Sequence, residues 1–464
     1  MITIIGAGLV GSLWGLLLQK KGFKVSIYEK RSDPRLQKPG AGRSINLIVT
    51  SRGLKGLELA GLGSQIHQLT VPVYGRMIHS KDGTLTYQPY GQDKECNYSV
   101  SRGDLNNFLI EEAEKAGVKF HFEHEVQDLK IESKEVRFKK PLMGSVAVTY
   151  DILFGTDGAG SKLRHLLATQ FPDQMTETTD WLEADYKELT LPKSKTGEPA
   201  LKTDALHIWP RGAHMMMALA NRDGSFTVTS YLPKINSIWS FDRLKKDSDI
   251  IDLFKSEFAD AIPLMPDYLN EFNENPQGHL GTVTCSKWVF ADSIALMGDA
   301  AHAIVPFFGQ GMNSGFEDCT TLLGLIDKYA GAWALILKEF EDVQKPNAKA
   351  IAEMALENWT EMRDKVGDQN FLLRKKMETE LEKKYPGQYK SRYGLITYTL
   401  APYILAQKAG LKQNELMDQV LKGLTSLDQV SWPLVDQLVQ KEWLPFVKEN
   451  HLEIKNYQLL RNEN

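Results

Sequence analysis

The sequence is poor in cysteine and has no long apolar run. Its 464 residues include only Cys96, Cys285 and Cys319, and none of them forms a C-x-x-C or another spacing typical of a metal site. This usage argues against a disulfide-stapled secreted domain and favours a reducing compartment. The longest apolar stretches, near Leu400 and Leu444, are broken by Pro, Lys, Gln or Glu before the roughly 20 residues that span a bilayer. We therefore expect no membrane span and no metal centre.

Charge of one sign is not in excess either. Lys and Arg total 55, Asp and Glu total 59, and the formal net charge is -4. A chain without a basic excess lacks the positive surface that neutralises phosphates, which argues against nucleic acid as a partner. The hydrophobic share of 42% is ordinary for a globular protein. At this length we expect two or three domains.

The first thirty residues follow the order strand, glycine turn, helix, strand. We predict a strand at Ile2–Ile5, a turn at Gly6–Gly11, a helix at Ser12–Lys21 and a second strand at Lys24–Glu29. A G-x-G-x-x-G turn binds a dinucleotide in this context. The alternative is a glycine turn that only links strand to helix. Because the first strand begins at Ile2, we also expect no signal peptide and a cytoplasmic protein.

Each glycine of this turn, and the acid at the end of the second strand, has a physical role in dinucleotide binding. Gly6 permits the tight turn, Gly8 lets a pyrophosphate approach the backbone, and Gly11 lets the helix pack against the strand. The helix N-terminus then attracts the phosphates. Glu29 can accept hydrogen bonds from ribose hydroxyls and would repel a 2'-phosphate, which favours FAD or NAD.

The rest of the chain divides by pattern. Glu135–Phe138 and Val146–Phe154 predict a hairpin that leads into a buried strand, and Lys119–Val126 alternates like a strand. Further strands are expected at Ala205–Trp209, His214–Leu219, Ser225–Leu232 and Ser293–Met297, and a long helix from about Gly311. After Trp333 the periodicity is helical. The expected helix breakers are Pro346, Pro386, Pro402 and Pro433.

Two later segments resemble signatures of one enzyme family. Gly155–Arg164 contains Asp157-Gly158, and Gly298–His302 runs on through Pro306 to Gly311-Met312-Asn313. With the first turn, they make residues 1 to about 320 similar to the FAD-dependent aromatic hydroxylases, the group A flavoprotein monooxygenases. The resemblance implies an α/β fold with a Rossmann-like FAD-binding domain at 1–160 and 281–330. It also implies an inserted β-sheet substrate domain at 161–280 and a helical C-terminal region at 331–464.

The third signature can also be interpreted from its residues. Asp299 ends a buried strand, where its carboxylate can accept a hydrogen bond from a ribityl hydroxyl of a flavin. Gly309, Gly311 and Gly315 let backbone approach a flat ring, and the helix start stabilises negative charge on reduced flavin. The alternative for Asp299 is a helix N-cap. His302 lies on the same loop, and we expect a structural role for it.

The resemblance implies a set of FAD contacts spread along the chain. Arg102, at a helix start, is an ordinary surface cation in the alternative interpretation, and the resemblance places it against the flavin phosphates or ring. The implied contacts are Gly6, Gly8, Val10, Gly11, Tyr28, Glu29, Arg31, Arg43, Arg102, Val126, Thr156, Asp157, Asp299, Gly311, Met312 and Asn313.

Several stretches resemble more narrowly the members of the family that hydroxylate the amino acid L-kynurenine. They are Gly42–Leu47, Arg76–Ser80, Pro89–Gly91, Leu206–Arg211, His302–Asn313 and Glu317–Cys319. This resemblance puts the substrate carboxylate on Arg76 and Tyr90, assisted by Asn358 and Tyr393. An Arg fork suits a carboxylate. It also implies that Phe307, Phe308, Gln310 and Tyr231 line the ring pocket. Without the resemblance, Arg76 would be explained by a surface salt bridge, Tyr90 by a turn and Tyr393 by helix packing.

The implied activity is NADPH- and O2-dependent hydroxylation of L-kynurenine to 3-hydroxykynurenine through a flavin C4a-hydroperoxide. The flavin carries the chemistry, so no catalytic side chain is expected, and no second glycine motif marks a site for NADPH. One alternative is a flavin hydroxylase of another aromatic acid. Another is a non-catalytic binding protein on the same fold.

The C-terminus bears on location. Eukaryotic members of the family carry a C-terminal membrane anchor, whereas this chain ends in the polar run Arg461–Asn464. We expect a soluble, bacterial-type enzyme. The alternative is a truncated form of a membrane-anchored homologue.

Overall fold

The computed structural model describes residues 1–36, 46–92, 95–141, 144–365 and 368–459. Arg43 and most of Gly42–Leu47 therefore lie outside the described residues. The chain forms two compact units. The first unit comprises 1–71, 99–182 and 279–349, and the second comprises 72–98, 183–278 and 350–464.

The first unit is built on a six-stranded sheet with the order β18-β19-β12-β1-β2-β8. β1 lies at its centre and pairs in parallel with both β12 and β2. Every residue of β1, β2 and β12 is buried, as expected of a parallel sheet covered on both faces. The strands are β1 (Ile2–Ile5), β2 (Val25–Tyr28), β8 (Lys119–His121), β12 (Ile152–Gly155), β18 (Val289–Phe290) and β19 (Ile294–Leu296).

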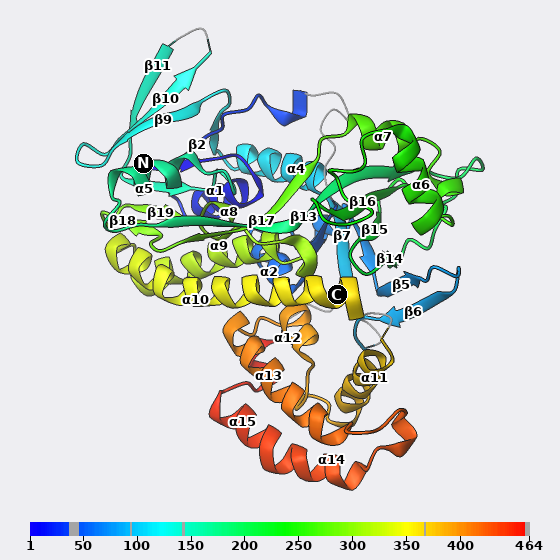
Figure 1. Ribbon diagram of the computed structural model, residues 1–464. Coiled ribbons are helices and arrows are strands. Elements are labelled where there is room, and N and C mark those ends of the chain that lie inside the picture. The colour runs from blue at the N-terminus through cyan, green and yellow to red at the C-terminus, as the bar shows by residue number, and fades with distance from the viewer. Residues whose placement is uncertain (37–45, 93–94, 142–143, 366–367, 460–464) are drawn as a thin grey trace. The chain divides into compact units, whose positions relative to one another are not determined.

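Helices and a small antiparallel sheet complete the first unit (Figure 1). α1 packs against α4 and α9, and α2 packs against α9. The helices are α1 (Leu9–Lys20), α2 (Ser51–Leu59), α3 (Gly63–Ile66), α4 (Arg102–Lys115), α5 (Lys162–Gln170), α8 (Asp299–His302) and α9 (Gly311–Lys328), with 3-10 turns η1 (Pro34–Leu36) and η3 (Pro306–Phe308). The small sheet contains β9 (Glu125–Lys130), β10 (Glu135–Lys140) and β11 (Gly144–Thr149).

The second unit contains a largely antiparallel sheet and a group of helices. β5 pairs in parallel with β14, and β14, β15, β16 and the later part of β13 form an antiparallel series. The strands are β5 (Gly75–His79), β6 (Leu85–Pro89), β13 (Glu177–Leu191), β14 (Ala205–Pro210), β15 (Met215–Ala220) and β16 (Phe226–Pro233). The remaining strands of the chain are β3 (Asn46–Val49), β4 (Thr70–Val73), β7 (Asn97–Ser101) and β17 (Gly278–Cys285).

The C-terminal region is helical, as predicted. After α6 (Asp247–Glu257), η2 (Ile262–Leu264) and α7 (Tyr268–Glu274), the helices are α10 (Trp333–Thr360), the π-helical turn η4 (Glu361–Lys365), α11 (Gln369–Lys384), α12 (Arg392–Tyr398), α13 (Tyr403–Val420), η5 (Leu427–Gln429), α14 (Trp432–Leu438), the π-helical turn η6 (Val439–Trp443), α15 (Leu444–Glu449) and η7 (Ile454–Tyr457). Among the residues described, no helix combines the length and apolar character needed to cross a bilayer.

The predicted elements mostly form, with differences that have local causes. The first helix begins at Leu9 rather than Ser12, because the glycine turn itself winds into the helix. Lys119–Val126 is not one strand but β8 followed by the start of β9, and Glu123 with a φ of 59° lies between them. The long strand β13 and the helices α6 and α7 were not predicted.

Pro346 does not break a helix, contrary to the prediction. It lies inside the 28-residue helix α10. An interior proline costs roughly 3 kcal/mol, but Phe340 and Ile351 on either side of it are fully buried, and their burial offsets that cost. Pro386 follows the end of α11, and Pro402 and Pro433 stand at helix starts, where the missing N–H has no cost.

Candidate functional site

The first glycine turn is tight on one side and open on the other. Gly6 has a φ of +102°, and a Cβ there would lie 2.5 Å from the Thr156 carbonyl oxygen. A Cβ on Gly11 would lie 2.1 Å from the Gly6 oxygen, whereas one on Gly8 would meet nothing within 4 Å. Gly6 and Gly11 thus allow close packing, and Gly8 faces space at the N-terminus of α1, where an anion is favoured.

Glu29 closes back onto this turn. Its Oε2 accepts a hydrogen bond from the Ala7 N–H at 2.9 Å, and its Oε1 accepts one from the Arg31 N–H at 2.9 Å. The carboxylate is therefore held at the end of β2 beside the turn, where ribose hydroxyls are recognised in dinucleotide folds. The Arg31 side chain is exposed.

The second turn is tied to the first by a threonine. Thr156 Oγ1 donates to the Ile5 and Gly6 carbonyl oxygens, at 2.9 and 3.0 Å. The next residue, Asp157, caps α5 by accepting from the backbone N–H groups of Lys162 and Leu163, at 2.7 and 3.2 Å. Burial raises the pKa of Asp157 despite these bonds.

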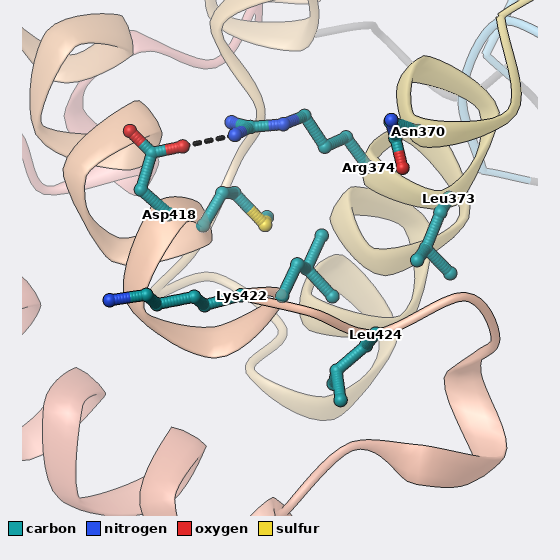
Figure 2. A pocket seen from close by; sticks show the side chains of 8 residues that line it. Asn370, Leu373, Arg374, Asp418, Lys422 and Leu424 are labelled. Atoms are coloured by element: carbon teal, nitrogen blue, oxygen red, sulfur yellow. Dashed lines mark hydrogen bonds and ion pairs between the residues drawn. The ribbon is translucent and has the colours of Figure 1, made fainter.

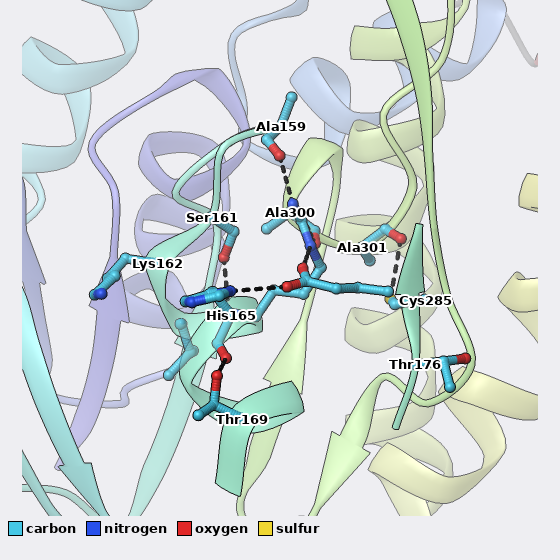
Figure 3. A network of polar contacts seen from close by, with 12 residues as sticks. Ala159, Ser161, Lys162, His165, Thr169, Thr176, Cys285, Ala300 and Ala301 are labelled. Carbon is cyan, nitrogen blue, oxygen red and sulfur yellow. Dashed lines mark hydrogen bonds and ion pairs between the residues drawn. The ribbon is translucent and has the colours of Figure 1, made fainter. Parts of the chain in front are cut away.

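An arginine that was not singled out from the sequence links the second and third turns. Figure 3 labels Ala159 and Ala300, whose carbonyl oxygens accept its hydrogen bonds. Arg164 donates to the Ala159 oxygen at 2.6 Å and to the Ala300 oxygen at 2.9 Å. Its Nε bonds Glu177 at 2.7 Å, and its side chain is only 6% exposed. The signal available in the sequence was its place in the Asp157-Gly158 segment. The contacts themselves are non-local.

We predict that Arg164→Met lowers the free energy of unfolding by about 2 kcal/mol, because it leaves the buried Ala300 carbonyl without a donor and removes the buried cation that pairs with the half-buried Glu177. Urea unfolding with saturating FAD measures the change. His165→Gln is the matched control, since His165 contacts the same Glu177 but is 62% exposed. An Arg164→Met midpoint equal to that of the control would contradict the role of this linkage.

The third segment brings Asp299 to the start of α9. Asp299 is the first residue of α8, half-buried, and its Oδ1 would lie 3.9 Å from a Cβ on Gly311. The helix cap is Gly298 rather than Asp299. Val10 of α1 packs here too, because a Cβ on Gly315 would lie 2.6 Å from Val10 Cγ2.

Asn313 organises the loop before α9. Its Oδ1 accepts from the Thr50 N–H at 2.9 Å, and its Nδ2 donates to the Ile48 and Gly309 oxygens at 2.8 and 2.7 Å. The side chain is fully buried. Gly309 has a φ of +64°, which favours glycine. Met312 is half-buried beside it.

His302 is buried in an ion pair, in keeping with a structural role. Its Nε2 lies 2.7 Å from Asp318 Oδ2, which also accepts from the Gly298 N–H at 2.8 Å. Burial alone would lower the pKa of His302, but the attraction and hydrogen bond of Asp318 outweigh it, and the pKa lies above 6.5. The ring also stacks on Trp288, with centroids 5.0 Å apart.

A raised histidine pKa gives the pair a defined pH dependence. Its stabilisation is complete below the ordinary histidine pKa and is lost as the pH rises through the raised value. We therefore expect the stability difference between the wild type and His302→Gln to shrink as the pH rises above the ordinary histidine pKa of about 6.5. Urea unfolding at saturating FAD measures it. A difference that stays constant or grows with pH would contradict the assignment.

The other residues of the implied cofactor set lie in the same unit. Tyr28 stacks between His121 and Phe138, with centroid distances of 4.5 and 4.3 Å. Val126 is buried and pairs in register with Phe138. Arg102 is exposed at the start of α4. One turn further along that helix, Asn106 donates to the Ala7 oxygen of the first turn at 3.2 Å, a contact that the sequence did not predict.

In the second unit, Arg76 is enclosed by two tyrosines. It is 8% exposed, on β5, and its guanidinium carbon lies 5.3 Å from the Tyr90 ring centroid and 5.8 Å from that of Tyr393. The two rings stack at 5.3 Å. Burial raises the pKa of both phenols, so both are neutral at pH 7.

Arg76 keeps unused hydrogen-bonding capacity. Its buried Nε has no hydrogen-bond partner among the described residues, and its Nη1 reaches Glu361 Oε1 only at 4.0 Å. Burial would lower the pKa of Arg76, and Tyr90, Tyr393 and Glu361 outweigh it, so the pKa is raised. A buried cation with an unsatisfied donor is the kind of group that a carboxylate ligand completes.

Asn97 joins this cluster, and Asn358, which was predicted to assist Arg76, lies on α10. Asn97 donates to the Tyr393 hydroxyl at 2.9 Å, and its buried Oδ1 has no hydrogen-bond partner among the described residues. Asn358, buried on α10, contacts Met362 Sδ at 3.5 Å. The sequence did not suggest Asn97.

The residues expected around the substrate ring fall in both units. Tyr231 is buried on β16 in the second unit, 6.1 Å from the ring centroids of both Tyr186 and Trp359. Phe307, Phe308 and Gln310 are buried in the first unit, immediately before α9.

A cavity of about 310 Å³ in the second unit contains none of the predicted residues (Figure 2). It lies between α11 and α13, with an ion pair between Arg374 and Asp418 at its side. Its lining is Asn370, Leu373, Arg374, Met417, Asp418, Leu421, Lys422 and Leu424.

The three turns of the first unit fit a flavin dinucleotide. An open glycine faces the N-terminus of α1, a fixed carboxylate follows β2, and a second helix N-terminus stands beside Asp299. The fold and these turns define a dinucleotide-binding flavoprotein.

Comparison with known proteins identifies the family. A family model described as FAD binding domain matches residues 1–355. The kynurenine 3-monooxygenase of Myxococcus xanthus is 40% identical over 97% of each chain, and that of Cytophaga hutchinsonii is 43% identical over 93% of this chain and 96% of the relative. The chain therefore belongs to the kynurenine 3-monooxygenase family and is an FAD-dependent aromatic monooxygenase.

A solved structure supports the fold alone. The tetrameric form of 2-methyl-3-hydroxypyridine-5-carboxylic acid oxygenase matches with a TM-score of 0.63 and 18% sequence identity. The match covers 80% of this chain and 95% of the other. The α/β fold predicted from the sequence is confirmed.

Proposed function

We propose that this enzyme hydroxylates L-kynurenine to 3-hydroxykynurenine with NADPH and O2. The observation that carries the substrate assignment is Arg76, a buried guanidinium with an unsatisfied Nε beside two stacked tyrosines. The relatives that are named kynurenine 3-monooxygenase support the same substrate.

The first unit would hold FAD. Gly8 and the N-terminus of α1 would bind the pyrophosphate, Glu29 the ribose, and Asp299 with the start of α9 the flavin end. Arg102 and Arg31, both exposed, would add positive charge at the phosphates. When bound and reduced by NADPH, FAD activates oxygen for transfer to the aromatic ring.

The second unit would hold the amino-acid end of the substrate. The Arg76 fork would donate to the carboxylate, and the neutral hydroxyls of Tyr90 and Tyr393 would add donors without another buried charge. Asn358 would assist them. Tyr231, buried in the same unit, would contact the aromatic ring. Phe307, Phe308 and Gln310, for which the resemblance implies the same role, belong to the first unit.

The protein's own contribution is orientation and exclusion of water. The aniline ring of kynurenine is already electron-rich, so the hydroxylation does not demand a strong base. Holding the ring in one position and keeping water away from the reacting atoms are what remain for the side chains. A phenolic acid, by contrast, would need help with deprotonation.

Stopped-flow flavin reduction tests this function. The holoenzyme is mixed with NADPH, with and without L-kynurenine, and the hydroxylated product is assayed. We expect L-kynurenine to accelerate reduction and to yield 3-hydroxykynurenine, and hydroxybenzoates to do neither. Hydroxylation of a hydroxybenzoate, with no turnover of L-kynurenine, would show that the substrate is another aromatic acid.

A further inference from the structure

We propose that Glu361 binds the α-ammonium group of the substrate, so that the site selects an amino-acid zwitterion over a simple aromatic carboxylate. This inference rests on the proposed function, in which Arg76 binds the α-carboxylate. It adds the second charged group that an amino acid presents and assigns it a partner.

Glu361 stands at a position where the helix changes its geometry. It follows α10 and begins the π-helical turn η4. π-Helical turns are rare in proteins, and those that do occur are often found at functional sites. The Glu361 side chain is 18% exposed, and its Oε1 lies 4.0 Å from Arg76 Nη1. The two charges are therefore close but do not form a hydrogen bond.

The charges around Arg76 leave this pair available to a ligand. Lys375 interacts electrostatically with both Arg76 and Glu361, but its Nζ donates a hydrogen bond to Glu378 at 3.2 Å. Lys375 and Glu378 thus neutralise each other. Of the described charged side chains that interact with Arg76, this leaves Glu361, and the two groups are separated by more than a hydrogen bond.

A zwitterion complements both of these charges at once. Its carboxylate would accept from the Arg76 fork, including the unpartnered Nε, and its ammonium group would donate to Glu361. A ligand with only a carboxylate would satisfy Arg76 but bring a second negative charge beside Glu361. The pair therefore favours an amino acid on both counts.

The competing role for Glu361 is that of a counter-ion to Arg76. The two roles predict opposite signs. A counter-ion competes with the ligand, so its removal tightens the binding of every carboxylate. An ammonium-binding residue loses affinity only for ligands that carry the ammonium group.

The experiment compares two ligands on the FAD-loaded enzyme. L-Kynurenine and its desamino analogue, 4-(2-aminophenyl)-4-oxobutanoate, are titrated while flavin fluorescence is followed. We expect the wild type to bind L-kynurenine at least about tenfold more tightly, as a charge-assisted hydrogen bond implies. In Glu361→Gln this preference should fall to about one, mainly through weaker binding of L-kynurenine.

Glu378→Gln is the matched control, because it removes a neighbouring carboxylate that is already paired with Lys375. It should keep the wild-type preference. A preference that survives in Glu361→Gln, or tighter binding of both ligands, would overturn the inference. The wild-type preference is measured independently of any variant, and its absence would overturn the inference too.

Failure of the proposed function has a different signature. In that case neither ligand perturbs the wild-type flavin, or L-kynurenine binds and is not hydroxylated. Failure of the Glu361 inference leaves L-kynurenine turnover by the wild type intact. In that case the wild type does not discriminate between the two ligands, or Glu361→Gln discriminates between them as the wild type does, or Glu361→Gln binds both ligands more tightly.

Discussion

Gly8→Val is expected to give a folded protein that binds FAD at least about a hundredfold more weakly, because phosphate contacts are charge-assisted hydrogen bonds. Gly8 has a φ of -75°, which valine adopts readily, and a Cβ there meets no protein atom within 4 Å. The added methyl groups would fill the space through which a pyrophosphate approaches the N-terminus of α1. Flavin absorbance per protein and FAD titration of the apoprotein measure the loss.

Two further glycine variants make this test specific. Gly11→Ala should lose stability as well as flavin, since its Cβ would lie 2.1 Å from the Gly6 oxygen. Gly324→Ala, on the exposed side of α9, meets nothing within 4 Å and should change neither. A Gly8→Val protein that retains the wild-type flavin content would show that the cofactor does not pass this turn.

Arg76→Met is expected to raise the dissociation constant of L-kynurenine at least about tenfold while leaving flavin content normal, since a buried charge-assisted contact is lost. Methionine keeps the apolar stem but removes the donors. Titration of the holoenzyme, followed by flavin fluorescence, measures the constant. Arg76→Lys should recover part of the affinity, because the charge remains but the planar fork does not.

Arg374→Met is the control for this substitution. Arg374 belongs to the same unit, but its side chain is 34% exposed in an ion pair with Asp418, and such pairs contribute little. The Arg374→Met variant should bind L-kynurenine with the wild-type affinity. If Arg76→Met binds L-kynurenine as tightly as Arg374→Met does, Arg76 does not hold the substrate.

The N-terminal turn was predictable because its requirements are local. Gly6 needs a φ of +102°, a Cβ on Gly11 would meet the nearby Gly6 oxygen, and Glu29 follows the next strand. The pattern of strand, turn and helix therefore contains nearly all the information. The end of β12 at Gly155 was predicted for the same reason, since the hydrophobic run Val146–Phe154 leads directly into it. The contact between Gly6 and the distant Thr156, by contrast, could not be read from the turn itself.

Contacts between distant segments were not predictable from the residues alone. Arg164 joins the carbonyls of Ala159 and Ala300, the second of them 136 positions away. Asn97 reaches Tyr393 across 296 positions. No periodicity or spacing records such pairs, because the backbone path that brings them together is set by the packing of the whole unit.

The sequence by itself determined the dinucleotide fold, the three glycine and acid turns, and the resemblance to an aromatic hydroxylase, because each rests on short-range backbone geometry. Only the tertiary structure decided that Pro346 stays within a helix and that Arg76 is buried beside Tyr90 and Tyr393 with Glu361 at 4.0 Å. The physical reason is burial. The cost of an interior proline is offset by the burial of apolar residues of the same helix. The buried charge of Arg76 is stabilised by the rings of Tyr90 and Tyr393 and by Glu361, and the last two lie far away in the sequence.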